Sequence, residues 1–293
     1  MLTKICILGG SGLIGSSILA EKTDSEKMIY TYNKNKIKTN HEGVQINILK
    51  DYEKLQKFLD LQKPDVVVNT ISNSNPCYCE ENQKETFEVN VEFVKEIFEL
   101  SNKNNFRLIQ FSSDYVFEGK KGKYTEKDKP NPINYYGYSK YMAEKIVLKN
   151  SSNTVIRTSQ VFGKNHDARF FNFVIENLRK GEKIDIYDDI FLSPTFVDDL
   201  IISLFKIIRK SLTGIFHVSG PECISKYEFA KYIAKVLKFD ENLINPVSIF
   251  KSEHKMNYPL NTCLDNTLTS TKLEQKFHSV PESLELFKNT MEK

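Results

Sequence analysis

Six short apolar runs, separated by longer segments of helical periodicity, follow one another through the first half of the chain. In order they read KICIL, MIYTY, VQINI, DVVVNTI, FRLIQF and NTVIRT. Strands that are apolar along their whole length are buried on both faces, and strands that alternate with helices form parallel sheets. The pattern therefore predicts an α/β fold built on a doubly wound parallel sheet. Two of the intervening helices are well marked, one over about residues 81–103 and one that begins near Tyr136.

The second half of the chain has a different rhythm, with shorter strands and longer loops after Val161. Helical periodicity predicts three helices here: Phe170–Arg179, Val197–Arg209 and Lys226–Leu237. We expect two lobes, with chain segments passing between them. The expected division is a Rossmann-type dinucleotide-binding domain over residues 1–160, rejoined by 195–220, and a smaller α/β substrate-binding lobe over 161–194 and 221–293.

Composition argues against several classes of protein. The 293 residues carry 41 basic and 38 acidic side chains, and the lysines are scattered, so we expect no nucleic-acid partner. The chain enters its first strand almost at once and has no apolar stretch of membrane-spanning length. We therefore expect no membrane partner and a cytoplasmic location. The five cysteines are odd in number and irregularly spaced, which argues against a disulfide framework and against a zinc site.

A glycine-rich turn lies between the first predicted strand and a helix, and it reads GGSGLIG over residues 9–15. Glycines there let the backbone approach a pyrophosphate closely, and the helix N-terminus favours the anion. The spacing G-x-x-G-x-x-G departs from the G-x-G-x-x-G form, and an ordinary strand-to-helix turn would look the same. Its place in the first βαβ unit favours dinucleotide binding. The candidate cofactor contacts are Gly9, Ser11, Gly12, Leu13, Ile14 and Gly15.

The end of the second predicted strand bears on the choice of nicotinamide cofactor. A carboxylate at this point would hold the ribose 2′-hydroxyl of NAD, but the chain reads NKNK over residues 33–36. Lys34 and Lys36 would offset the charge of a 2′-phosphate, although a solvated loop would have the same composition. The segment favours NADP(H) and leaves NAD(H) open, with Asn33 and Lys34 as candidate contacts.

Tyr136 and Lys140 lie four residues apart in the stretch YGYSK, so on a helix they share one face. A nearby ammonium and an oxidised nicotinamide ring would lower the pKa of a tyrosine, which allows proton exchange near neutral pH. Ser113, at the end of the run FRLIQFSS, is placed to hydrogen-bond the same substrate oxygen. A Tyr/Lys pair at this spacing is common by chance. Together with the glycine turn and the strand-end serine, it predicts proton transfer coupled to hydride transfer.

Motifs in order along nearly the whole chain resemble those of extended short-chain dehydrogenases, in particular the dTDP-4-dehydrorhamnose reductases. The matching segments are GGSGLIG, PDVVVNTIS, SSDYVFEG, PINYYGYSK, VIRTSQVFG, SPTFVDDL, GIFHVSG and NYPLNTCLDN. The resemblance implies catalytic roles for Ser113, Tyr136 and Lys140. It also implies an NAD(P)H-dependent reduction of a 4-keto-6-deoxy nucleotide sugar in polysaccharide biosynthesis.

The same resemblance implies the other contacts of the site. Further cofactor contacts are expected at Asn47, Ile48, Asn69, Thr70, Ile71 and Ser112, besides Tyr136 and Lys140. Substrate contacts are expected at Ser113, Asp114, Tyr115 and Gln160. Related dehydratases carry an Asp-Glu pair where this chain has Asp114-Tyr115, so the resemblance favours a reductase over a dehydratase.

The presumed substrate lobe departs from the reductase pattern. A tryptophan of the family is replaced by Gln160, and the chain contains no tryptophan. The family segment DQIGAPT reads DIFLSPT here, and the arginine before a late proline is Tyr258. These changes leave the sugar open, because specificity depends on pocket contacts. Two alternatives also remain, a nucleotide-sugar epimerase and a non-catalytic regulatory subunit like that of methionine adenosyltransferase. The expected partner is a nucleotide-sugar substrate, and a homodimer stays open.

The other candidate groups favour structural roles. The histidines have neither metal nor triad spacing; they are His41, His166, His217, His254 and His278. We expect His217 to be a partly buried strand residue rather than a base. The adjacent acids Asp198 and Asp199 are expected at the start of a helix, where carboxylates are favoured.

Overall fold

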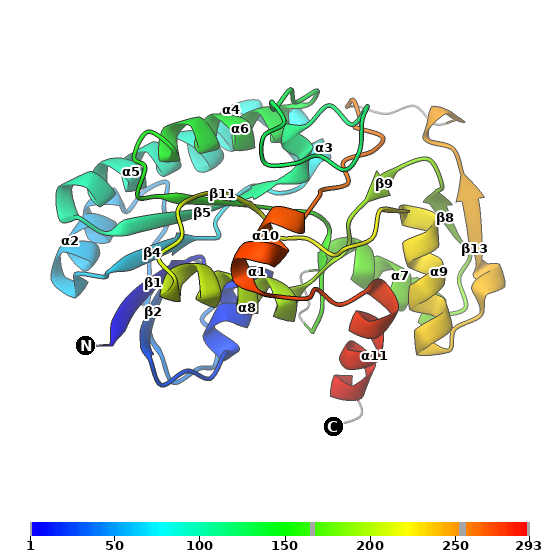
Figure 1. Cartoon of the computed structure of the whole chain (residues 1–293), viewed down its shortest axis with the longest axis horizontal. Coiled ribbons are helices and arrows are strands. Elements are labelled where there is room, and N and C mark those ends of the chain that lie inside the picture. Colours follow the sequence, from blue (N-terminus) through cyan, green and yellow to red (C-terminus); the bar gives the residue numbers. More distant parts are fainter. Residues whose placement is uncertain (1, 165–167, 252–255, 292–293) are drawn as a thin grey trace.

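A parallel sheet of seven strands forms the centre of the structure (Figure 1), a computed structural model that describes residues 2–164, 168–251 and 256–291. The strand order is β11-β6-β5-β4-β1-β2-β3. These strands are β1 (Thr3–Leu8), β2 (Glu26–Tyr32), β3 (Glu42–Gln45), β4 (Val66–Asn69), β5 (Arg107–Ser113), β6 (Thr154–Thr158) and β11 (Gly214–His217). The order reverses between β1 and β4, so the sheet is doubly wound and has the crevice in which such sheets bind ligands.

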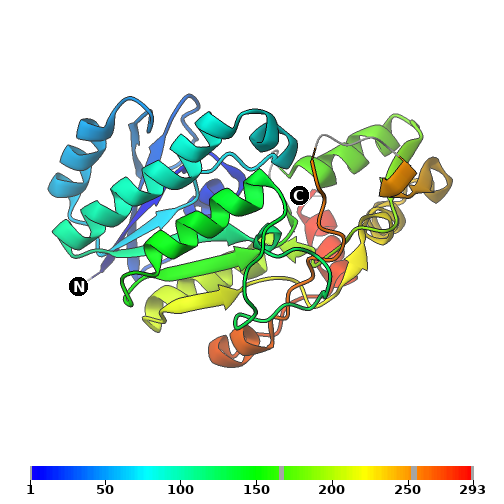
Figure 2. The same cartoon turned by 90° about the horizontal axis from the view of Figure 1, so that it is seen from above.

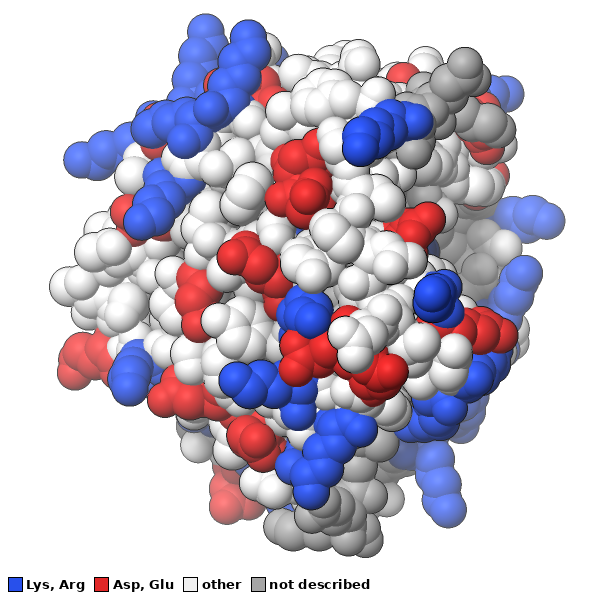
Figure 3. Space-filling model, turned by 90° about the vertical axis from the view of Figure 1, so that its right-hand side faces the viewer, with Lys and Arg blue, Asp and Glu red and all other residues white. Residues whose placement is uncertain are grey.

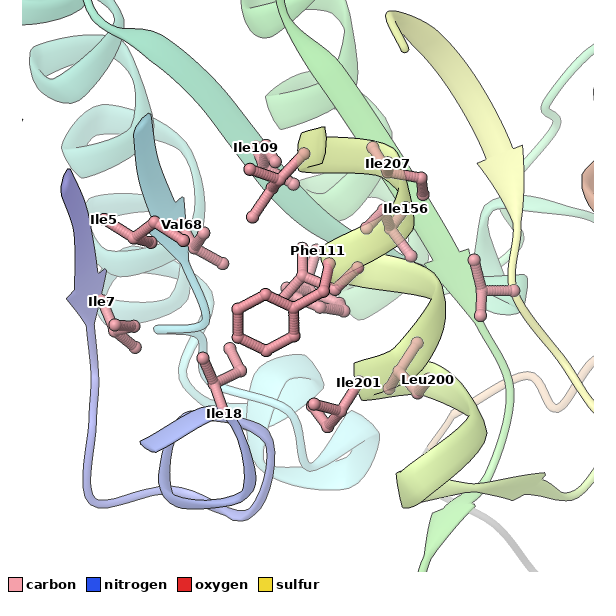
Figure 4. Packing of buried hydrophobic residues seen from close by; sticks show 14 of the residues in the cluster. Ile5, Ile7, Ile18, Val68, Ile109, Phe111, Ile156, Leu200, Ile201 and Ile207 are labelled. Carbon is pink, nitrogen blue, oxygen red and sulfur yellow. The ribbon is translucent and has the colours of Figure 1, made fainter. Parts of the chain in front are cut away.

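Helices cover both faces of this sheet. One face packs against α1 (Leu13–Ala20) and α8 (Val197–Arg209), and the other against α2 (Tyr52–Gln62), α5 (Phe93–Asn104) and α6 (Tyr135–Val147). Figure 4 shows Ile5, Phe111 and Leu200 in the layer between the strands and α8. The strands are apolar on both sides because each side is covered by helices.

A smaller lobe lies at one end of the sheet (Figure 2). Its helices are α7 (Arg169–Arg179), α9 (Lys226–Leu237) and α11 (Val280–Met291), with α10 (Thr267–Leu273) leading back to the sheet. Its strands pair as β8 (Ile184–Tyr187) with β13 (Ile244–Val247), β9 (Phe191–Leu192) with β12 (Ile224–Ser225), and β7 (Val161–Phe162) with β10 (Thr195–Phe196). The lobe has its own buried core, centred on the rings of Phe162, Phe171 and Phe229.

All six strands predicted in the first half are present, and α7, α8 and α9 begin and end within one residue of the prediction. The helix expected over about residues 81–103 differs. It consists of α3 (Pro76–Glu81), α4 (Gln83–Phe87), a π-helical turn (Glu88–Glu92) and α5. Asn82, whose backbone is not helical (φ −124°, ψ 54°), separates α3 from α4. The apolar periodicity continues across this break, which is why it does not show in the sequence.

The cysteines differ from expectation at one pair. Cys223 and Cys263 form a disulfide, although the number and spacing of the cysteines argued against a disulfide framework. The antiparallel pairing of β12 with β9, together with a bridge between Phe191 and Asn261, brings the two segments side by side. The expectation was wrong for this pair because it rested on spacing along the chain and not on the fold.

The surface of the smaller lobe mixes both signs of charge. The end of the molecule in Figure 3 carries lysine and arginine next to aspartate and glutamate, with no broad field of one sign on that face. Asp198 and Asp199 lie in the first turn of α8, as predicted. None of the helices within the described ranges is both long and apolar enough to span a bilayer.

Candidate active site

The glycine-rich turn joins β1 to α1 and is held from two sides. The hydroxyl of Thr70, just after β4, donates to the carbonyl of Leu8 (2.8 Å), and the amide of Gly10 donates to the carbonyl of Thr31 (2.8 Å). Gly9 has φ +87°, and a Cβ there would lie 2.8 Å from Thr70 and Ile71, so only glycine fits. The turn is therefore a rigid support at the point where the strand order reverses.

The N-terminus of α1 has the features that a pyrophosphate requires. No side chain caps the first turn, whose N-cap is the exposed residue Gly12. A Cβ at Gly12 would meet only the carbonyl oxygen of Gly9 at 3.7 Å, so protein packing does not demand glycine here. The open space and the free first turn fit a phosphate group that approaches the backbone closely. Leu13 and Ile14 begin the helix, while Gly15 is buried against the turn.

The other predicted cofactor contacts surround this turn in two groups. Asn33 and Lys34 are exposed in the loop after β2, and Asn47 and Ile48 follow β3. Asn69 is fully buried, and its amide donates to Gln110 on β5 (2.8 Å) while its oxygen accepts from the backbone of Ile71 (3.1 Å). Asn69 thus braces the crevice from within the sheet. The exposed Asn33 and Lys34 fit a ribose or its phosphate, whereas Asn47 and Ile48 are half-buried and the side chain of Asn47 accepts from the backbone amide of Leu49 (3.0 Å).

Ser113, Tyr136 and Lys140 come together beside this crevice. Ser113 ends β5, whereas Tyr136 and Lys140 lie one turn apart on α6, and all three are buried. A hydrogen bond between Ser113 and Tyr136 acts to lower the pKa of Tyr136. Helix α6 is pressed against the segment after β5, because a Cβ at Gly137 would lie 2.0 Å from the carbonyl oxygen of Tyr115. Glycine in the YGYSK stretch therefore allows the close approach of the two elements.

Burial sets the protonation of these groups. Burial raises the pKa of Tyr136 above its ordinary value, opposed by the bond with Ser113. Burial lowers the pKa of Lys140 to about 8, while the carboxylate of Glu144 acts in the opposite direction. The sequence led us to expect a lowered pKa for Tyr136; loss of water outweighs the neighbouring charges here. In this state Tyr136 keeps its proton and is ready to act as an acid.

Asp114 is the centre of a buried hydroxyl cluster. Its two oxygens accept from Ser113 (2.9 Å), Ser159 (2.8 Å) and Thr262 (2.5 Å), which come from three separate segments. Burial raises the pKa of Asp114, and these three hydroxyl groups counteract the shift. Tyr115, the next residue, lies with its ring 5.7 Å from that of Tyr136. Asp114 therefore orients the Ser113 hydroxyl instead of facing substrate as an open carboxylate.

Two buried groups that the sequence analysis missed support helix α6, which carries Tyr136 and Lys140. Asn90, in the π-helical turn, accepts from the backbone amide of Asn73 (2.8 Å) and donates to its carbonyl (3.0 Å) and to Ser139 (2.9 Å). Ser139 donates to the carbonyl of Tyr136 (2.7 Å). The sequence signal was a single asparagine between two valines in the stretch VNVEFV.

The second missed group is the ion pair of Arg157 and Glu144, both about 1% exposed. Glu144 accepts two bonds from Arg157, of 2.9 and 2.7 Å, and one from Ser112 (2.6 Å). The hydroxyl of Ser112, predicted as a cofactor contact, is thus turned toward α6. Ser112 lies next to Ser113 on β5, and both serines hydrogen-bond residues of α6.

The remaining predicted residues are Gln160, which directly follows the Asp114 ligand Ser159, and the histidines. Gln160 has a left-handed backbone, φ +40°, between β6 and β7 and is half-buried. His217 is fully buried, where only partial burial was expected, and His166 and His254 lie outside the described residues. No group of three His, Cys, Asp or Glu side chains that could hold a metal ion occurs within the described ranges.

The doubly wound sheet, the glycine turn and the Ser-Tyr-Lys set define an extended short-chain dehydrogenase/reductase, a class of NAD(P)H-dependent oxidoreductases. Within it the chain belongs to the RmlD substrate binding domain family, whose sequence pattern matches residues 3–292. The predicted family and fold class are therefore confirmed.

Individual relatives agree with this assignment. The dTDP-4-dehydrorhamnose reductase of Aggregatibacter actinomycetemcomitans is 33% identical over 239 residues, covering 76% of this chain and 79% of that protein. The structure of the Bacillus anthracis dTDP-4-dehydrorhamnose reductase in complex with NADP superposes with a TM-score of 0.88 at 25% identity. It covers 99% of this chain and 100% of the other. Methionine adenosyltransferase 2 subunit beta of Rattus norvegicus is 26% identical, covering 84% of this chain and 75% of that protein.

Proposed function

We propose that the protein reduces a 4-keto-6-deoxy nucleotide sugar with NADPH, as a dTDP-4-dehydrorhamnose reductase does, in deoxysugar biosynthesis. The observation that carries the proposal is the buried set of Ser113, Tyr136 and Lys140 beside the uncapped glycine turn. The family assignment and the relatives named dTDP-4-dehydrorhamnose reductase support it. A reductase needs one hydride donor and one proton donor, and the site provides a place for each.

The chain's own residues account for binding and proton transfer. Bound NADPH would supply the hydride, with its phosphates at the start of α1. Tyr136 holds its proton because burial raises its pKa, and it delivers that proton to the ketone oxygen as negative charge develops there. Ser113 stabilises the same oxygen by a hydrogen bond, for which the substrate competes with Asp114. The Lys140 ammonium stabilises the tyrosinate that remains after proton transfer.

The exposed Lys34 and Lys36 after β2 support NADPH over NADH, since both would offset the charge of a 2′-phosphate. A nucleotide sugar is the proposed substrate, and we place the enzyme in the cytoplasm. A homodimer remains an open option for its assembly.

The first test is oxidation of NADPH by the purified protein in the presence of a dTDP-4-keto-6-deoxyhexose, followed at the absorbance of NADPH. Replacing Tyr136 by Phe removes the proton donor and should lower the rate by about 10²–10⁴-fold. Tyr138→Phe is the matched control, because Tyr138 lies on the same helix with its side chain exposed. Full activity in the Tyr136→Phe variant would falsify the assigned role.

A regulatory subunit is the second candidate, favoured by the likeness to methionine adenosyltransferase 2 subunit beta. It predicts co-purification with a synthetase and no turnover of any keto sugar. A nucleotide-sugar epimerase predicts tightly retained NAD and no net NADPH consumption. The complete proton-transfer set weighs against a purely binding role, because binding does not require a proton donor.

A further inference from the structure

Lys226 is a basic residue of the smaller lobe that has no role in the proposed reaction. It is the first residue of α9, after the N-cap Ser225. A helix N-terminus carries partial positive charge, so a lysine there is placed against the helix dipole. The capping box formed by Ser225 and Glu228 already stabilises this end of the helix. Helix stability therefore gives no reason for a lysine at this position.

Backbone hydrogen bonds connect Lys226 to the segments that lie beside Asp114. Its amide donates to the carbonyl of Ile190 (2.9 Å), and the preceding strand β12 pairs with β9. On the other side of β9, Phe191 exchanges backbone hydrogen bonds with the segment that contains Thr262. Thr262 in turn donates to Asp114. Lys226 is thus separated from the Asp114 cluster by one short, hydrogen-bonded ribbon.

The side chain of Lys226 is half-buried and lies over the ring of Phe170, with Nζ 5.8 Å from the ring centroid. Burial lowers its pKa, and the charges of Asp114 and Cys77 act in the opposite direction. Asp114 forms no ion pair with Lys226, and its two carboxylate oxygens accept from hydroxyl groups instead. Within the described part of the chain, no carboxylate lies within ion-pair distance of its Nζ. Such a charge is costly without an anion beside it.

The surroundings of this ammonium identify the anion. The charges of Asp114, after β5, and Cys77, on α3, both act on Lys226, and Cys77 contacts the hydroxyl of Tyr258 (3.1 Å), so the ammonium lies near the boundary between the sheet domain and the smaller lobe. Tyr136 and Ser113, which would hold the ketone oxygen, lie on the sheet side of that boundary. In a 4-keto nucleotide sugar the diphosphate is bonded to C1, across the ring from C4. A cation on the lobe side therefore suits the diphosphate.

We propose that Lys226 binds the diphosphate of the nucleotide-sugar substrate and so sets the distance between the nucleotide and the reacting ketone. This inference rests on the proposed function, because it assumes a nucleotide-linked substrate. Lys226 is a specificity residue and takes no part in proton transfer. The position of its Nζ over the ring of Phe170 pre-orients the ammonium before substrate arrives.

The test compares the binding of dTDP and UDP with that of thymidine and uridine, by calorimetry on the full chain. Lys226→Met keeps the length and packing of the stem and removes the charge. We expect it to weaken diphosphate binding by about 10–100-fold, to leave nucleoside binding within about twofold, and to leave NADPH binding unchanged. Lys226→Arg should restore most of the affinity. Lys231→Met is the matched control, because Lys231 lies on the same helix and pairs with Glu241.

Equal diphosphate affinity in Lys226→Met and the unaltered enzyme would overturn the assignment, as would an equal loss for nucleosides and diphosphates. Catalysis gives an independent readout, since KM for the keto sugar should rise while kcat changes little. An enzyme that binds dTDP through Lys226 but oxidises no NADPH would contradict the proposed function and leave this assignment intact. An unaltered enzyme that binds neither diphosphate would contradict both.

Discussion

Lys140 is the residue whose titration should limit the reaction on the alkaline side. Its pKa is lowered by burial to about 8, whereas the pKa of Tyr136 is raised, so Lys140 loses its proton first as the pH increases. The ammonium stabilises the developing tyrosinate only while it is charged. We therefore expect kcat/KM to be constant near neutral pH and to fall above about pH 8.

This prediction can be checked with profiles of kcat/KM from about pH 6 to about pH 10. Lys140→Arg stays charged throughout this range and should move the decline to higher pH. Lys140→Met should be slower at every pH and lack the decline. A decline at the same pH in the unaltered enzyme and in Lys140→Arg would show that another group is responsible.

At the scale of elements, the π-helical turn before α5 is the support most open to a mutational test. Its Asn90 links the loop after β4 to the catalytic helix α6 through Asn73 and Ser139. Asn90→Ala should lower kcat by about 10-fold or more, because a small displacement of catalytic groups is costly. The loss of hydrogen bonds at a buried site should also lower the free energy of unfolding by about 1–3 kcal/mol.

The control separates positioning from simple destabilisation. Asn104→Ala removes one hydrogen bond, which joins Asn104 at the end of α5 to Asp60 on α2. Neither of these residues belongs to α6. It should affect stability without changing kcat in the fully folded protein. If both variants lose the same fraction of kcat at a temperature where each is folded, Asn90 has no special role in positioning α6.

The disulfide between Cys223 and Cys263 predicts a response of stability to reduction. Its sequence separation of 40 residues corresponds to a stabilisation of up to about 4 kcal/mol through restriction of the unfolded chain. Urea unfolding should shift to lower midpoints when dithiothreitol is added, and a Cys223→Ser/Cys263→Ala variant should not respond. Cys77→Ser, which alters a free cysteine, should respond as the unaltered protein does. A midpoint insensitive to dithiothreitol in the unaltered protein would contradict this prediction.

How far the elements are predictable depends on what defines each one. The bounds of α8 and α9 follow from local features, an amphipathic period and, in α9, the capping box of Ser225 and Glu228. The breaks at Asn82 and in the π-helical turn leave the apolar period intact. These breaks therefore cannot be predicted from the spacing of apolar residues. The disulfide is likewise set by strand pairing between distant segments.

At the scale of the whole molecule, the part of the site that depends on local sequence is predictable. The part that depends on contacts between distant segments is not. Tyr136 and Lys140 share a helix and Ser113 ends a strand, so local patterns, taken with the glycine turn, are enough to group them. The roles of three other residues, Lys226, Asn90 and Thr262, depend on contacts between segments that are far apart in sequence. No local pattern identifies these three residues. The resemblance to the family predicts roles only for positions that match the family's motifs, and it does not predict tertiary contacts.

The buried ion pair of Arg157 and Glu144 joins the elements behind the catalytic helix into one unit. It links β6 to α6 and, through Ser112, to β5. Arg157 also approaches the Nε2 atom of His217 on β11 (3.3 Å), whose Nδ1 contacts the carbonyl of Tyr124 (2.9 Å). Burial and the charge of Arg157 lower the pKa of His217 to about 3, so this histidine stays neutral and accepts from Arg157.

Breaking this pair should therefore affect the whole fold and not only the site. Arg157→Met leaves the Glu144 carboxylate buried without a counter-ion, at a cost of about 3–5 kcal/mol in the free energy of unfolding. Glu144→Met/Arg157→Met removes both charges and should be more stable than Arg157→Met alone, as urea unfolding can measure. The double variant should still lose activity, since Lys140 loses the carboxylate that raises its pKa and would deprotonate at lower pH. A double variant no more stable than Arg157→Met would mean that packing, and not the uncompensated charge, accounts for the loss.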